Sequence, residues 1–319
     1  MRLCRFLNAG TPRAAFYSED RLIPLAAASA IYAQRVGGRL DVPESDDLLL
    51  SLPGGTAHDA VSRLSTWVSG AGAADVATIA IPAAVAHLLV PIPRPNKLFL
   101  LAGNYADHIK EGGGIAAERA ETFPYVFMKP PTTTLTNPGQ PIRIPRVSPG
   151  AIDWELELAV VIGKRVKGVS EVEALSAVAG YTVINDISNR KFKPNPTRKE
   201  RAKDSFFDWL HGKWHDSFCP CGPCVVSADA IADPQSLPMR LSLNDQVRQN
   251  ASTALMIFPV AAIIEFISSF VTLEPGDIIS TGTPAGVGST TGTFLKPGDV
   301  LTAHIDSIGT LVTPVQSEE

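Results

Sequence analysis

The segment from Asp153 to Gly163 constrains the fold of this chain more than any other part of its sequence. Glu155 and Glu157 stand two positions apart in it, and an unbroken apolar run follows them. On a strand, residues i and i+2 point to the same face, so the two carboxylates share one face. The other face should be buried, because it carries Trp154, Leu156 and Leu158.

Two carboxylates this close are costly without a compensating positive charge, because one of them would have to take up a proton. A hard divalent cation such as Mg²⁺ or Mn²⁺ removes that cost and selects oxygen ligands. A third carboxylate, Asp186, stands at the end of another strand-like segment. The alternative interpretation of Glu155 and Glu157 is an exposed edge strand with a solvated acidic face.

Composition argues against several classes of protein. The chain has 319 residues, 45% hydrophobic and 19% charged, with a net charge of −4, which is typical of a globular protein. It has no arginine-rich segment, which disfavours nucleic acid as a partner. Its longest apolar stretches are too short to span a membrane, and its first residues read as a strand rather than a signal peptide. We therefore expect a cytoplasmic protein without a membrane partner.

The length suggests two domains of unequal size. A proline cluster between Pro91 and Pro95 marks the expected boundary, because it cannot continue a helix or a central strand. We expect a small N-terminal domain over residues 1–90 and a larger domain over residues 91–319. The first should contain a strand-like start, up to Phe16, and helices at 26–35 and 57–69.

The larger domain is rich in strand-like segments and in turns that contain glycine or proline. This balance predicts an α+β fold dominated by β-structure, not a doubly wound sheet. Helices are predicted at 171–179 and 254–270. Strands are predicted at 97–102, 125–128, 140–144, 157–162, 181–185, 224–227, 239–244, 277–281 and 300–305.

A histidine and a glutamate follow the first of these strands. His108 and Glu111 are three positions apart, so they share one face if the segment is helical. A carboxylate beside an imidazole fixes its orientation and raises its basicity, as a general base requires. Three glycines, residues 112–114, follow and can form the hinge of a lid. The alternative is an incidental pair at the end of a surface helix.

Two lysines and one glycine-rich loop are further candidates for binding. Lys129 and Lys213 can each stabilise developing negative charge, or can lie at the surface as most lysines do. The loop at 279–288 follows a predicted strand. Its backbone N–H groups, including that of Gly282, and the Thr283 hydroxyl can bind an anion such as a substrate carboxylate. The alternative is a tight turn without a binding role.

Two other segments carry reactive or charged residues. Cys219, Cys221 and Cys224 lie in a segment with two prolines, which we interpret as a stiff loop. A zinc site would need a second pair of ligands, so structural cysteines are favoured, with some redox sensitivity if the loop is exposed. Residues 189–203 are strongly basic and are interpreted as a solvated surface loop or a subunit contact.

Taken in order along the chain, several segments together resemble the fumarylacetoacetate hydrolase family. The resemblance covers about residues 95 to 310. It implies a mixed β-roll with a smaller N-terminal domain, and a homodimer. The matching segments are Gly103-Asn104-Tyr105, Phe127-Met128-Lys129, Asp153 to Gly163, Asn185-Asp186-Ile187-Ser188, Lys213 and Pro275 to Pro284.

The resemblance also implies roles for individual residues. His108 is similar to the base that activates water, Glu111 to the residue that orients it, and Lys213 to the lysine that stabilises an oxyanion. The implied ligands of Mg²⁺ (or of Mn²⁺ or Ca²⁺) are Glu155, Glu157 and Asp186. The implied substrate-binding residues are Lys129, Gln249, Gly282 and Thr283.

The implied activity is metal-dependent hydrolysis of a C–C bond in a 2,4-diketo acid, such as an acylpyruvate, fumarylpyruvate or fumarylacetoacetate, in a catabolic route. The same scaffold also serves oxaloacetate decarboxylases and isomerases or hydratases of 2-keto acids, which remain alternatives. An inactive scaffold or binding protein is an alternative of another class. After Asp186 the chain departs from the sequence that many members share, and this leaves the substrate open.

Overall fold

Strand β11 (Leu156–Ile162) lies near the middle of the largest sheet, between β12 (Val178–Asn185) and β17 (Ile278–Ser280). The structure is a computed structural model that describes residues 1–319. The strand order is β4-β3-β2-β1-β14-β12-β11-β17-β6-β7. The other strands are β1 (Arg2–Asn8), β2 (Thr11–Tyr17), β3 (Arg21–Pro24), β4 (Ile81–Pro82), β6 (Leu98–Ala102), β7 (Tyr125–Met128) and β14 (Cys219–Ser227). Two short strands pair off this path, β5 (Leu88–Leu89) with β1 and β8 (Leu135–Thr136) with β14.

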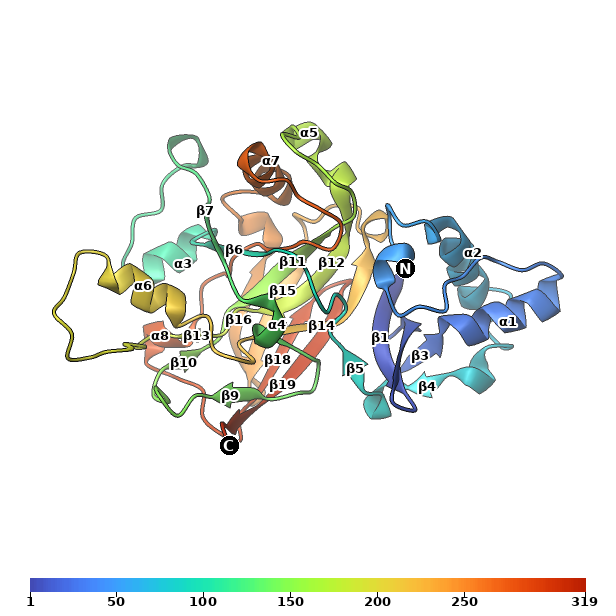
Figure 1. Cartoon of the computed structure of the whole chain (residues 1–319), viewed down its shortest axis with the longest axis horizontal. Coiled ribbons are helices and arrows are strands. Elements are labelled where there is room, and N and C mark those ends of the chain that lie inside the picture. The colour runs from blue at the N-terminus through green and yellow to red at the C-terminus, as the bar shows by residue number, and fades with distance from the viewer.

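A second sheet lies against the first, and strands dominate the fold as predicted (Figure 1). Its order is β16-β15-β18-β19-β9. Its strands are β16 (Gln246–Ser252), β15 (Pro238–Leu243), β18 (Val300–Ile305), β19 (Gly309–Ser317) and β9 (Ile142–Ile144). The two sheets share one buried cluster, which includes Leu158 and Leu301. Two further strands, β10 (Ile152–Asp153) and β13 (Ser188–Asn189), pair beside the ends of β11 and β12.

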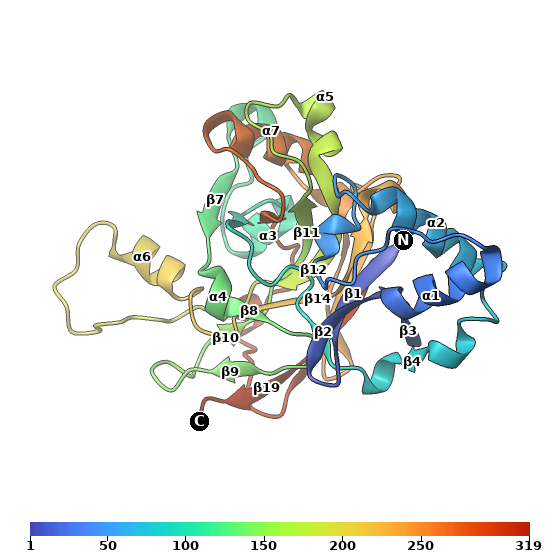
Figure 2. The same ribbon diagram turned by 45° about the vertical axis from the view of Figure 1, so that its right-hand side comes forward.

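The helices lie around the edges of the sheets (Figures 1 and 2). The N-terminal part carries α1 (Leu25–Val36) and α2 (His58–Ser69). The opposite side carries α3 (Ala106–Glu111) and α6 (Asp204–His211), and the top of the view carries α5 (Glu171–Ala174) and α7 (Val260–Phe270). The remaining helices, α4 (Pro131–Thr134) and α8 (Gly288–Thr291), are single turns, as is α5. None of the helices combines the length and the apolar character needed to cross a membrane.

The N-terminal strands extend the large sheet. Strand β1 pairs with β14, with Leu3 opposite Val225. Leu3 and Phe16 also belong to the same buried cluster as Val161 of β11. The N-terminal residues and the rest of the chain thus share hydrogen bonds and a core, and the division at residue 90 stays a prediction.

All nine predicted strands are present, and the helices predicted at 26–35 and 57–69 correspond to α1 and α2. Two other helix predictions were too long. The helix predicted at 171–179 ends in a 3₁₀ turn, and β12 begins at Val178. The helix predicted at 254–270 begins only at Val260, because Pro259 before it lacks an N–H and starts a helix more readily than it continues one.

The cysteine segment is a strand, not a loop. All nine residues of β14, from Cys219 to Ser227, are buried. The four cysteines of the chain are free and buried, which agrees with the structural role predicted for them. Burial raises the pKa of the Cys221 thiol to about 12. The loop interpretation was wrong because prolines are tolerated where a strand needs no hydrogen bond from that residue.

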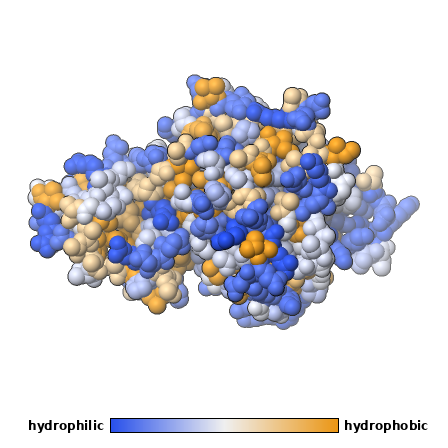
Figure 3. All heavy atoms as spheres, turned by 180° about the vertical axis from the view of Figure 1, so that it is seen from behind, coloured by the Kyte–Doolittle hydropathy of each residue, from blue (hydrophilic) through white to orange (hydrophobic).

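The basic segment mainly forms a loop that projects from the body before α6 (Figures 1 and 2). It shows as a hydrophilic protrusion from behind, where hydrophobic residues elsewhere lie in separate groups among hydrophilic ones (Figure 3). Arg198 anchors the loop to α6 through Asp204 and Asp208, at 2.8 and 2.5 Å. Arg190, the first cation of the basic segment, does not lie in a solvated surface loop and is described with the site below.

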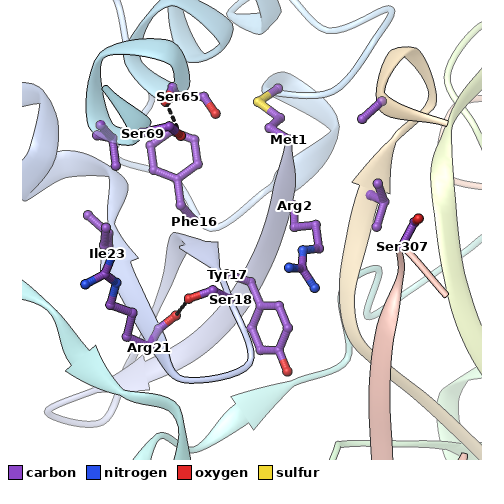
Figure 4. A pocket seen from close by; sticks show the side chains of 13 residues that line it. Met1, Arg2, Phe16, Tyr17, Ser18, Arg21, Ile23, Ser65, Ser69 and Ser307 are labelled. Atoms are coloured by element: carbon purple, nitrogen blue, oxygen red, sulfur yellow. Dashed lines mark hydrogen bonds between the residues drawn. The ribbon is translucent and has the colours of Figure 1, made fainter. Parts of the chain in front are cut away.

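A hollow of about 350 Å³ lies between the N-terminal strands, α2 and β14 (Figure 4). Arg2 lies over the ring of Tyr17, 5.8 Å from its centre. The Ser69 hydroxyl donates to the carbonyl of Ser65, which closes one wall. No residue predicted to carry chemistry lines this hollow, so the candidate site lies elsewhere.

Candidate active site

Three buried carboxylates meet where β11 begins and β12 ends. Glu155 comes directly before β11, Glu157 is its second residue, and Asp186 follows β12. The strands pair antiparallel, with Leu156 opposite Asn185, so the start of one lies beside the end of the other. One oxygen of each carboxylate lies within 4.8 Å of the other two. The structure thus brings together the three predicted metal ligands.

The alternative of an exposed edge strand is wrong. Strand β11 has a hydrogen-bonded neighbour on each side, and all seven of its residues are buried. Its apolar residues divide between two buried clusters, with Leu158 in one and Val161 in the other. Glu157 is therefore an acidic residue in the interior, where an uncompensated charge is expensive.

Two buried lysines face the carboxylates. The Lys213 Nζ donates to Asp186 Oδ2 at 2.6 Å, to Glu155 Oε2 at 3.1 Å and to the Ser188 hydroxyl at 2.8 Å. The Lys129 Nζ donates to Asp186 Oδ1 at 2.5 Å and to two backbone carbonyls. Neither lysine lies at the surface, which was the alternative for each of them. Asp186 thus accepts from one lysine on each oxygen.

Arg190 is a member of the site that the sequence interpretation placed in a solvated loop. Its guanidinium contacts Glu155 Oε1 at 2.7 Å and Asp153 Oδ2 at 2.8 Å. Asp153 also accepts from the backbone N–H groups of Gly288 and Ser289. The surface-loop interpretation was wrong for Arg190, because these two buried carboxylates draw the first cation of the segment inward.

The cations are distributed unevenly among the carboxylates. Burial by itself raises the pKa of Glu155, but Lys213, Arg190 and His108 outweigh it and lower that pKa to about 2. Burial, followed by the charges of Asp186 and Glu155, raises the pKa of Glu157 well above its ordinary value. Glu157 thus has the least compensation of the three.

The chemistry of this site fits a divalent cation. The Glu157 Oε2 accepts from the Ser280 hydroxyl at 2.6 Å and from the Gly282 N–H at 2.9 Å. The Glu157 Oε1 is buried and has no hydrogen-bond partner. An unpartnered carboxylate oxygen within reach of two other carboxylates is the environment that an oxygen-seeking cation satisfies.

The predicted anion-binding loop is tied to β11. Besides the bond from Gly282 to Glu157, the Thr283 hydroxyl donates to the carbonyl of Leu156 at 2.9 Å. Gln249 of β16 donates to the Thr283 hydroxyl at 2.8 Å and accepts from the N–H of Leu156 at 3.0 Å. All of these side chains are buried. In this structure they position the carboxylates, and their contact with a substrate stays a prediction.

His108 and Glu111 form the predicted pair on α3. The His108 Nδ1 lies 2.8 Å from Glu111 Oε1, and each side chain is 19% exposed. The other Glu111 oxygen accepts from the N–H of Gly286 at 2.9 Å. That bond links α3 to the loop after β17. Because the Nδ1 of His108 contacts Glu111, its Nε2 can form a hydrogen bond with a further partner.

Two aromatic rings cover Lys213. Its Nζ lies 5.2 Å from the ring centre of Phe127 and 5.6 Å from that of Trp209. The rings contact each other edge to face, with centres 5.0 Å apart. Aromatic faces attract a cation, so β7 and α6 both help to hold the lysine in place.

Sequence comparison agrees with this geometry. Residues 97–316 match the family model described as fumarylacetoacetate (FAA) hydrolase C-terminal. The chain belongs to the fumarylacetoacetate hydrolase family. It is 41% identical over 230 residues to a mitochondrial oxaloacetate tautomerase of Xenopus laevis, which covers 72% of this chain and 68% of the relative. It is 36% identical over 282 residues to a 2,4-didehydro-3-deoxy-L-rhamnonate hydrolase of a Sphingomonas species, covering 88% and 92%.

Solved structures of the family share the fold and confirm the predicted fold class. A fumarylacetoacetate hydrolase from Exiguobacterium antarcticum superposes with a TM-score of 0.74 at 28% identity, covering 100% of both chains. A maleylpyruvate hydrolase from a Sphingobium species, solved with manganese(II) and pyruvate, superposes with a TM-score of 0.71 at 27% identity and the same coverage. The relatives of this chain thus include hydrolases and a tautomerase, and one structural neighbour binds manganese.

Sequence reasoning missed the residues that hold the carboxylates. Arg190 lies in the basic segment and Asp153 begins the segment that carries Glu155 and Glu157, but the sequence analysis assigned neither residue to the site. Ser188 and Ser280 were missed for the same reason, since a serine near a strand end carries no signal of its own. The position of Arg190, four residues after Asp186, was the one usable signal, although its ion pairs are with Asp153 and Glu155.

Proposed function

We propose that this protein is a metal-dependent hydrolase that cleaves a C–C bond in a 2,4-diketo acid such as an acylpyruvate. The observation that carries the proposal is the position of His108 and Glu111. The imidazole is oriented through its Nδ1 by Glu111, whose other oxygen accepts from Gly286 in the same loop whose Gly282 donates to Glu157 of the carboxylate cluster. Hydrolysis needs a base for water beside a site for the keto acid, and this arrangement supplies both.

Mg²⁺ or Mn²⁺, held by Glu155, Glu157 and Asp186, would supply positive charge that polarises the 2-oxo group of the substrate. Calcium is a third candidate. A maleylpyruvate hydrolase of the same fold was solved with manganese(II) and pyruvate, which supports a divalent cation and a keto acid as ligands.

The residues of this chain would act on the water and on the departing electrons. The Nε2 of His108 accepts a proton as the water oxygen bonds to the distal carbonyl carbon, C4. The C3–C4 bond then breaks, and its electron pair moves to C3 and into the 2-oxo group. Lys213 stabilises the negative charge on that oxygen. A proton returns to C3, so an acylpyruvate gives pyruvate and a carboxylic acid.

A second candidate is isomerisation of a 2-keto acid, with oxaloacetate as the example. The relative from Xenopus laevis is described as an oxaloacetate tautomerase. Tautomerisation or decarboxylation would use the carboxylates and Lys213, but neither needs an activated water. The two candidates therefore differ in their dependence on His108. An inactive scaffold would show neither activity, with or without a chelator.

The test compares two variants on two substrates at saturating Mg²⁺ or Mn²⁺. General-base assistance contributes about 10²–10⁴-fold, so His108→Ala should reduce kcat for acylpyruvate cleavage by that factor. Tautomerisation or decarboxylation of oxaloacetate should fall far less. Asp186→Asn should damage every activity, since each uses the cluster. Unchanged acylpyruvate cleavage in His108→Ala would remove the main support for hydrolysis.

A further inference from the structure

The loop after β17 links the carboxylate cluster to the predicted base. We call its residues 283–289 the bracket loop. Strand β16 holds the start of this loop, because Gln249 donates to the Thr283 hydroxyl and to the carbonyl of Pro284, each at 2.8 Å. The Thr283 hydroxyl in turn donates to the carbonyl of Leu156 at 2.9 Å. The first residues of the bracket loop are therefore fixed to β11 and β16.

Two buried residues, Asp153 and Trp154, hold the rest of the bracket loop. The Trp154 indole N–H donates to the carbonyl of Gly286 at 3.1 Å. Asp153 accepts from the N–H groups of Gly288 at 2.6 Å and of Ser289 at 3.0 Å. Figure 1 shows α8, which begins at Gly288, beside β10, with α3 above them. Three hydrogen bonds thus fix this part of the loop to the segment that carries two of the predicted metal ligands.

Gly286, in the middle of the bracket loop, is confined on two sides. Its φ is +105°, a conformation that favours glycine, and a Cβ there would lie 2.1 Å from the carbonyl oxygen of Arg248. The loop therefore passes directly against β16 at this residue. Because the Trp154 indole holds the carbonyl of Gly286 and the backbone of Arg248 lies against its Cα, the N–H of Gly286 has a fixed direction.

The N–H of Gly286 orients the predicted base. It donates to one oxygen of Glu111 at 2.9 Å, and the other Glu111 oxygen lies 2.8 Å from His108 Nδ1. Helix α3 offers these side chains little support of its own, since it has six residues and none of them is buried. A hydrogen bond to a charged carboxylate is stronger than one between neutral groups. The direction of the imidazole therefore depends on where Gly286 lies.

We propose that Trp154 is a positioning residue for the base. A buried indole N–H needs an acceptor, and many carbonyls would satisfy it. Here the acceptor belongs to the residue of the bracket loop that donates to Glu111. From Trp154 the contacts run through Gly286 to Glu111, which orients the imidazole. A residue beside the carboxylate cluster thus sets the position of a base on a separate helix. The role rests on the proposed function, in which His108 accepts a proton from water.

The first experiment measures kcat for acylpyruvate cleavage in a double-mutant cycle at saturating Mn²⁺. Trp154→Phe keeps an aromatic ring but removes the N–H, and it should lower kcat by about 3- to 10-fold, the size of one hydrogen bond. In Glu111→Ala the same change should have no further effect, because the link to the imidazole is already lost. Trp67→Phe is the matched control, since Trp67 packs on Tyr32 in the N-terminal part, and it should leave kcat unchanged.

Two results of this cycle would overturn the proposal. If Trp154→Phe lowers kcat by the same factor with and without the Glu111 side chain, the indole acts by another route. If Mn²⁺ affinity in calorimetric titration falls in parallel with kcat, Trp154 acts on the carboxylate cluster instead. A second variant carries 3-benzothienylalanine at position 154, which has the shape of tryptophan with sulfur in place of the N–H. It should lower kcat as Trp154→Phe does, and unchanged kcat in this variant would overturn the proposal even where Trp154→Phe folds poorly.

The second experiment does not depend on catalysis. Exchange of the Gly286 amide hydrogen, followed by NMR, should be at least about 5-fold faster in Trp154→Phe than in the unmodified protein, because the loop has lost one of its hydrogen bonds. In Trp67→Phe it should not change. Equal protection of Gly286 in Trp154→Phe would overturn the proposal. If the unmodified protein cleaves no acylpyruvate, the proposed function fails, while the exchange rate still decides whether Trp154 holds the bracket loop.

Discussion

The carboxylate cluster and the His108 segment differ in how firmly the structure holds them. Glu155, Glu157 and Asp186 are at most 5% exposed and lie at the ends of central strands. His108 and Glu111 lie on a six-residue helix that ends at three glycines. One hydrogen bond, from Gly286 to Glu111, links their side chains to the opposite loop.

Under the proposed function, the two regions would carry different tasks. A charged cluster must be fixed in advance, because reorganising buried charges during the reaction would be costly. A base that covers the substrate must instead let it enter, and a short helix beside glycines allows that motion. The predictions below test whether binding and water activation divide between the two regions in this way.

The largest effect is expected for Glu157→Gln in the rigid region. Its metal affinity should fall by more than about 100-fold, the upper value for losing only an outer-shell partner, and activity should be lost. Without metal, the variant should unfold at the same temperature or higher, since a neutral amide needs no proton to avoid repulsion from Asp186 and Glu155. Calorimetric titration with Mn²⁺ and thermal unfolding measure the two effects. If the variant bound Mn²⁺ as tightly as the unmodified protein, the assignment of metal binding to the carboxylate cluster would be wrong.

Glu111→Gln should have the next largest effect, confined to catalysis. An amide orients the imidazole less firmly than a carboxylate, so kcat should fall by about 10- to 100-fold, part of what a general base contributes. Mn²⁺ affinity should not change, because Glu111 belongs to the other region. Lys110→Gln is the control on the same helix, since Lys110 is 65% exposed and pairs only with Asp107. Equal loss of activity in both variants would contradict the role of Glu111.

A smaller effect concerns the mobility of the lid without any substitution. Residues 104 to about 118 should exchange amide hydrogens faster than β11 and should slow when oxalate binds with Mg²⁺. Strand β11 should exchange slowly in both states. Equal protection of the lid segment with and without oxalate would count against its closure.

The smallest effect separates two neighbouring glycines of the hinge. Gly113 has a φ of +82°, so an alanine there carries about 1–2 kcal/mol of strain. Gly112 has a φ of −77° and accepts an alanine at ordinary contact distances. Gly113→Ala should change kcat a few-fold, whereas Gly112→Ala should leave kcat nearly unchanged. An equally small change of kcat in both variants would show that catalysis does not depend on the positive φ of Gly113.

Sequence reasoning found the apolar strands of the fold because their patterns are local. The segments at 125–128 and 300–305 coincide with β7 and β18. It missed β16 and β19, whose residues are largely polar or interrupted by Pro314. Those strands exist because neighbours already present supply hydrogen bonds, a contribution that no short window contains.

The candidate site was found in part for a similar reason. Glu155 and Glu157 can be recognised from sequence because residues two positions apart on a strand share one face. The structure brings Asp186 beside them. Arg190 looks like one more cation in a basic stretch until Asp153 and Glu155 are known to lie beside it. Gln249 donates to Thr283, 34 positions away, and accepts from the N–H of Leu156, 93 positions away, and spacing does not predict such contacts.

The parallel pairing of β17 with β6 affects how this protein folds while it is being synthesised. It joins Leu98 to Ile278, and the same late segment supplies Ser280 and Gly282 to Glu157. A growing chain therefore exposes its acidic residues long before their partners have been synthesised. Contacts of such long range form slowly. We expect the metal to be acquired only after synthesis has passed this segment, and nascent chains to depend on protection from aggregation until then.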